Sequence, residues 1–134
     1  MSNVDPLHSV LAFSQALISI RSLVQRELGG QSSLFDLVAQ AKKNTLKRSG
    51  TLADDTEYFV HGIGCRFISS HGEEVDVDVL PDGREIFDTW RIESFVRSLR
   101  WDIGDTSILA DACDELVRQG KLGEVKRGWY YLTG

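Results

Sequence analysis

The sequence is poor in cysteine and has no long apolar run. Cys65 and Cys113 are too few for a disulfide framework and match no zinc-binding spacing, so we expect two reduced thiols. No uninterrupted apolar stretch approaches the roughly 20 residues of a membrane span, and the amino terminus lacks the pattern of a secretory signal. With 134 residues the chain can bury a core without a structural metal. These features predict a cytoplasmic protein without membrane contact, metal or cofactor.

Basic residues are scarce in the middle of the chain. Residues 54–88 contain ten acids but only two bases, Arg66 and Arg84, whereas residues 1–50 carry six bases and three acids. An acidic segment repels the phosphates of nucleic acid and attracts cationic groups. The distribution therefore argues against a nucleic-acid partner and is consistent with a basic protein, a cation or no charged partner at all.

The spacing of apolar residues predicts a single α+β domain over residues 1–134. Residues 1–50 show helical spacing interrupted by "LGG", which predicts an N-terminal helical hairpin. Residues 58–99 first alternate and then return to helical spacing, which predicts a small central antiparallel sheet and a helix. Residues 105–134 predict a C-terminal helix plus β-hairpin, an ending similar to that of winged-helix modules. The segment "KRSGTLADD" between the first two parts is expected to be a linker.

Polar residues mark the expected helix starts. Asp5 precedes Pro6, and an aspartate followed by proline suits the N-cap and first turn of a helix. The other predicted caps, in chain order, are Ser32 or Ser33, Asp88, and Asp105 or Thr106.

The segment "VDVDV" (75–79) places its valines on one face of a strand and Asp76 and Asp78 on the other. Paired carboxylates could hold a divalent cation or serve as acid and base. No calcium-loop pattern accompanies them, and a solvated or partner-binding acidic face is the favoured interpretation. The following "PDGR" predicts a tight turn.

His61 and Cys65 in "HGIGC" could form an imidazole–thiol pair, which would require contact between the two side chains. Four residues of extended chain span about 13 Å, so a core thiol and a structural histidine are favoured over catalysis. The rival hypothesis is a small Cys/His or metal-dependent hydrolase that uses these two residues with Asp76 and Asp78.

Arg84, Asp88, Trp90 and Arg91 lie where a turn passes into a helix. Asp88 would cap that helix, and either arginine could pair with a strand carboxylate and hold helix and sheet together. Trp90 is a candidate binding anchor, because tryptophan is frequent among interface hot spots.

The predicted C-terminal helix and β-hairpin also suggest an alternative function, that of a winged-helix transcriptional regulator. Its helix, however, carries four acids (Asp105, Asp111, Asp114 and Glu115) against Arg118 alone. Such a helix would be repelled from the major groove of DNA, so a module of this shape without DNA binding is favoured.

Four motifs together resemble an uncharacterised family of small bacterial proteins: "HGIGC" (61–65), "VDVDV" (75–79), "PDGR" (81–84) and "FDTWR" (87–91). The resemblance implies an association with bacterial toxin genes and an immunity role. Immunity proteins against nucleases or deaminases often present acidic surface to the basic cleft of the toxin.

The function expected from the sequence is therefore a non-enzymatic immunity protein or antitoxin that occludes a basic toxin domain of nuclease or deaminase type. His61, Cys65, Arg84, Asp88 and Arg91 are assigned structural roles, with no catalytic residue and no metal ligand. The expected contacts with the toxin are Glu73, Glu74, Asp76, Asp78, Asp82 and Trp90.

Overall fold

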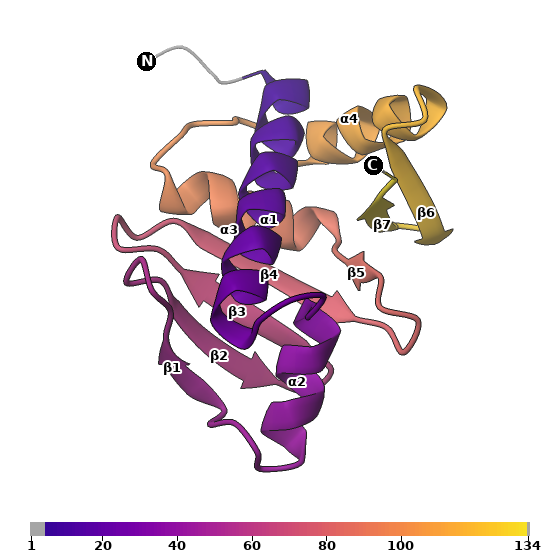
Figure 1. Cartoon of the computed structure of the whole chain (residues 1–134). Coiled ribbons are helices and arrows are strands. Elements are labelled where there is room, and N and C mark those ends of the chain that lie inside the picture. Colours follow the sequence, from indigo (N-terminus) through magenta and orange to yellow (C-terminus); the bar gives the residue numbers. More distant parts are fainter. Residues whose placement is uncertain (1–4, 134) are drawn as a thin grey trace.

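Two helices, five strands, two more helices and two final strands follow one another in the computed structural model, which describes residues 5–133 (Figure 1). This arrangement confirms the predicted α+β class, with a five-stranded antiparallel sheet in the middle and a strand pair at the end. In chain order the elements are α1 (Pro6–Leu28), α2 (Leu34–Lys42), β1 (Ser49–Thr51), β2 (Glu57–His61), β3 (Gly64–Ile68), β4 (Glu74–Val79), β5 (Glu85–Ile86), α3 (Thr89–Ser98), α4 (Ser107–Arg118), β6 (Leu122–Lys126) and β7 (Trp129–Leu132).

Side-chain caps fix the starts of the first three helices. The Asp5 carboxylate accepts a hydrogen bond from the Leu7 amide at 2.9 Å, and Pro6 occupies the first helical position. Ser33 forms a capping box with Asp36 at the start of α2, and Asp88 accepts from the Arg91 amide at the start of α3. These caps confirm the predictions from Asp5, Ser33 and Asp88. At α4, Thr106 is the N-cap without a side-chain bond, while Asp105 accepts from the Ser107 amide.

The strands are ordered β1-β2-β3-β4-β5, so each strand pairs with its neighbour in sequence. β1 lies within the segment expected to be a linker, and it pairs with β2 through Ser49 opposite Phe59. That expectation was wrong because "SGT" has neither alternating apolar residues nor strong β-formers. The short edge strand is specified by its partner strand instead.

One face of the sheet carries the core. Side chains from β2, β3 and β4 point into it, and α1 and α2 lie over this face (Figure 1). The helix α3 runs beside β4, where the Ser98 hydroxyl accepts a hydrogen bond from the Glu74 amide at 3.0 Å. The valines of "VDVDV" are buried in this core, as the alternation predicts, together with Val60, Cys65 and Phe67.

The C-terminal hairpin is joined to the rest of the chain by backbone and core contacts. Phe87 and Tyr130 exchange two backbone hydrogen bonds of 2.8 and 3.0 Å. The Phe87 ring is fully buried and lies 4.7 Å from that of Phe13 in α1. The helix α4 packs on α1, so both parts of the module share the core of the sheet.

The first helix is longer and more apolar than the search for uninterrupted runs indicated. α1 has 23 residues and contains an 18-residue window with a mean hydropathy of 1.4, enough by length and composition to cross a membrane. Histidine, serine, glutamine and arginine interrupt its apolar positions, so no single run stands out in the sequence. One side of α1 nevertheless packs into the core through Val10, Phe13, Leu17 and Val24, which is the arrangement of a core helix.

Candidate functional site: the open face of the sheet

The second face of the sheet is turned away from α1 and α2. Alternation along the three central strands brings polar and apolar side chains onto this face in register. One row across the strands runs Phe59, Arg66, Asp76, and the next runs Glu57, Ile68, Glu74. We call this surface the open face; its side chains are Glu57, Phe59, His61, Arg66, Ile68, Glu74, Asp76 and Asp78.

Ion pairs neutralise part of the acidity that the sequence predicts here. His61 Nε2 lies 2.9 Å from Asp76 Oδ1, and Arg66 Nη1 lies 3.6 Å from Glu74 Oε1. The guanidinium group of Arg91 reaches Asp78 from α3 at 3.1 Å. Four carboxylates thus share the face with two guanidinium groups, which leaves two negative charges in excess when His61 is neutral.

Arg91 connects three elements at one end of the open face. Its guanidinium group contacts Asp78 on β4 and, at 3.2 Å, Asp88 at the start of its own helix. The same group lies 4.8 Å from the ring centroid of Trp129 on β7, within reach of a cation–π interaction. Since only 16% of the Arg91 side chain is exposed, water screens these contacts weakly. The arginine therefore ties α3 and the terminal hairpin to the sheet.

Asp82 and Arg84 form a separate pair within the β4–β5 turn. Arg84 Nε donates to Asp82 Oδ2 at 2.8 Å, and its guanidinium group lies 4.9 Å from the Tyr131 ring centroid. The hydrogen bond from the Arg84 amide lowers the pKa of Asp82 below its usual value, so this exposed carboxylate stays ionised at neutral pH. Asp82 is thus paired within its turn and apart from the strand carboxylates.

Besides Asp82, two of the expected contact residues lie outside the open face. Trp90, on the first turn of α3 beside Arg91, is 72% exposed and is the most exposed large apolar side chain in residues 5–133. Glu73 lies in the β3–β4 turn on the side covered by α1, where it lines a pocket with Ala16 and Ser19. The run "EEVDVDV" therefore divides its acids between the two faces, beginning with Glu73.

His61 and Cys65 lie on opposite faces of the sheet. Cys65 is fully buried, and this burial raises the pKa of its thiol to about 12. Its Sγ lies 3.9 Å from the Arg66 carbonyl oxygen, while the imidazole of His61 is partly exposed and pairs with Asp76. The geometry provides neither a thiolate nor a base in contact with the thiol. No cluster of three or more metal-ligating side chains occurs within residues 5–133.

Close backbone approach explains the second glycine of "HGIGC". A Cβ on Gly64 would lie 2.3 Å from the Val77 carbonyl oxygen and 2.7 Å from Asp78 Oδ1. The first glycine, Gly62, has a φ of +50° in the β2–β3 turn. Backbone geometry therefore explains both glycines without any role in a reaction.

A model of the family described as "Domain of unknown function (DUF6896)" matches residues 7–132. The chain belongs to this family. The DUF6896 match runs from the start of α1 to the end of β7, so it includes the open face and the terminal hairpin. No curated protein and no solved structure matches the chain significantly.

Sequence reasoning missed Glu57, Phe59 and Arg66 as members of the open face. The signal was present, since "EYFVH" alternates and its odd-numbered residues point opposite to Tyr58 and Val60. The charge of each strand was considered separately, and Arg66 was therefore not assigned to this face. Its ion pair with Glu74 depends on how β3 and β4 are paired.

Proposed function

We propose that this DUF6896 protein acts by binding another protein through its open face and has no reaction of its own. The observation that carries the proposal is the composition of this face, where carboxylates outnumber guanidinium groups and apolar side chains lie among them. A surface of this kind attracts a basic partner over a distance and offers apolar contact once the partner is bound. The exposed Trp90 supplies an anchor near the same end of the sheet as Arg91.

The more specific form of the proposal is an immunity protein or antitoxin that acts in the cytoplasm. Its partner would be a toxin domain with a basic active-site cleft, of nuclease or deaminase type, and occlusion of that cleft would inhibit the toxin. Support comes from the resemblance of the four central motifs and from the excess of negative charge on the open face. Charge attraction would speed the association, and buried apolar contacts would slow the dissociation.

The two rival functions have weaker support. A Cys/His hydrolase would need a thiolate near an imidazole, but Cys65 is buried with a raised pKa and His61 pairs with Asp76. A winged-helix regulator would insert α4 into DNA, but Asp111 and Asp114 lie exposed on that helix.

Co-expression with the products of adjacent genes tests the proposal. The tagged chain should co-purify at low salt with one of them, and this product should lose its toxicity in the complex. If none of these products associates with the chain at low salt, the immunity proposal is wrong.

The choice of charge variants follows from the ion pairs. Reversal of Asp78 would place a cation against Arg91 and disturb the fold, so this residue is a poor probe. Glu57 is the first residue of β2, is exposed and has no ion-pair partner among residues 5–133. Glu57→Lys should slow association with the partner, whereas Asp111→Lys on α4 is a matched control that should not.

A further inference from the structure

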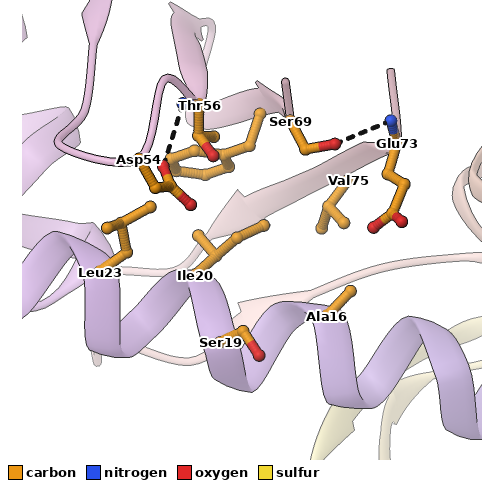
Figure 2. A pocket seen from close by; sticks show the side chains of 10 residues that line it. Ala16, Ser19, Ile20, Leu23, Asp54, Thr56, Ser69, Glu73 and Val75 are labelled. Carbon is orange, nitrogen blue, oxygen red and sulfur yellow. Dashed lines mark hydrogen bonds between the residues drawn. The ribbon is translucent and has the colours of Figure 1, made fainter. Parts of the chain in front are cut away.

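A pocket opens on the other side of the sheet, between the middle of α1 and the turns at one end of the strands (Figure 2). Its volume is about 180 Å³. The floor is apolar, and it includes Ile20 and Leu23 of α1 and Phe67 and Val75 of the sheet, each at most 9% exposed. We call this cavity the α1 pocket.

Two carboxylates flank the α1 pocket. Figure 2 shows Asp54, from the β1–β2 turn, on one side and Glu73, from the β3–β4 turn, on the other, with Ile20 and Val75 between them. Neither carboxylate forms an ion pair within residues 5–133. The acids on β4 differ in this respect, because Glu74 and Asp78 each pair with an arginine and Asp76 contacts the imidazole of His61.

Hydroxyl groups complete the polar lining. Thr56 is only 4% exposed, and its hydroxyl points into the α1 pocket beside the Asp54 carboxylate (Figure 2). Hydrogen bonds from the Thr56 side chain and amide lower the pKa of Asp54, which keeps that group ionised at neutral pH. Ser19 lies below on α1 (Figure 2). Hydroxyl oxygens can accept hydrogen bonds from an ammonium or guanidinium group.

We propose that the α1 pocket binds a lysine or arginine side chain of a partner protein. The alkyl part would lie on the apolar floor, and the charged end would lie between Asp54 and Glu73, a division that long basic side chains commonly adopt. Sites for whole small molecules usually enclose about 300–1,000 Å³, and this pocket is smaller. A shallow groove past Glu73, towards Ala12 and Trp101, gives room for residues that flank the inserted one.

This site is distinct from the open face, because the sheet separates the two. The proposal for the α1 pocket is therefore tested independently of the proposed function. A protein that fails to bind through the open face could still bind a basic side chain in the α1 pocket.

Nuclear magnetic resonance titration of the labelled protein tests the pocket with a defined probe, a blocked Gly-Lys-Gly peptide. The peptide should shift the amide signals of Ser19, Thr56 and Glu73, whereas the same peptide with an acetylated lysine should not. Free cadaverine distinguishes the source of the ammonium group and should bind no more tightly than the peptide. Tighter binding of cadaverine would overturn the assignment to a protein side chain.

Two sets of variants locate the site. Asp54→Asn combined with Glu73→Gln should weaken the affinity for the lysine peptide about tenfold, while Asp55→Asn, in the same turn, should leave it unchanged. Ser19→Phe should fill the pocket and abolish binding, and Ser22→Phe, an exposed position on the same helix, is its control. Equal shifts with the acetylated peptide, or unchanged binding by Ser19→Phe, would overturn the proposal.

Discussion

Replacement of Arg91 should cost far more stability than replacement of another arginine on the same helix. Arg91→Met keeps most of the alkyl chain but removes two charge-assisted contacts, to Asp78 and Asp88, and the stacking on Trp129. Hydrogen bonds to charged groups contribute about 1.5–3 kcal/mol each, and a cation–π contact about 1 kcal/mol. Because Arg91 and its two carboxylate partners keep some contact with water, we expect a total loss of about 2–4 kcal/mol in the free energy of unfolding and not the full sum of these contributions.

Arg97 provides the control. It pairs with Glu93 one turn away on α3, but its side chain is 72% exposed, so Arg97→Met should change the free energy of unfolding by at most about 0.5 kcal/mol. Urea unfolding followed by tryptophan fluorescence measures both variants.

A second substitution separates lost contacts from an uncompensated charge. Asp78→Asn added to Arg91→Met should restore about 1 kcal/mol, since it removes a carboxylate left without its cation. Arg91→Met and Arg97→Met of equal stability would refute the role of Arg91 as the link between sheet, helix and hairpin.

Three further predictions concern buried groups and backbone approach. Gly64→Ala should destabilise the protein by more than about 2 kcal/mol in urea unfolding, because the added Cβ would meet the Val77 carbonyl oxygen. Gly72→Ala is the control and should cost about 1 kcal/mol, since Gly72 has a φ of +88° but free space around it. Equal costs for the two variants would contradict the close approach at Gly64. Burial raises the pKa of both Cys65 and Cys113 to about 12, so a thiol reagent should label neither cysteine in the folded protein near pH 8 and both after denaturation. The same raised pKa values mean that the stability of the protein should fall as the pH rises from 9 towards 12. Rapid labelling of the folded protein would contradict the burial of these thiols. Burial also raises the pKa of Glu85 beside Arg21, so this group contributes stability that is present below its pKa in the unfolded chain and is lost as the pH rises through its pKa in the folded protein. Glu85→Gln should therefore match the stability of the parent near pH 4 and be more stable than the parent near pH 7. Denaturation of both proteins at the two pH values checks this prediction.

Local patterns were enough to predict most of the fold. The helix and β-hairpin predicted within residues 105–134 correspond to α4, β6 and β7, and the caps at Asp5, Ser33 and Asp88 lie where the sequence places them. These features depend on neighbouring residues, through alternation, turn residues and capping side chains. The edge strand β1 was missed because its pairing with β2 is not encoded in its own three residues.

The candidate surface could be predicted only in part, because its charge depends on pairing between strands. Alternation indicated that Asp76 and Asp78 share a face, but only the register of β2, β3 and β4 brings His61 and Arg66 to the acids. The position of Glu73 beside α1 likewise depends on how a distant helix crosses the sheet. Such contacts join residues far apart in sequence, where periodicity carries no information.

The association rate with the partner found by co-expression tests the central claim most directly. We predict that Glu57→Lys slows association about threefold to tenfold relative to the parent and Asp111→Lys, and that added salt reduces the difference. The dissociation rates of these variants should change less than the association rates. Equal association rates for the parent, Glu57→Lys and Asp111→Lys at low salt would contradict recognition of a basic partner by the open face.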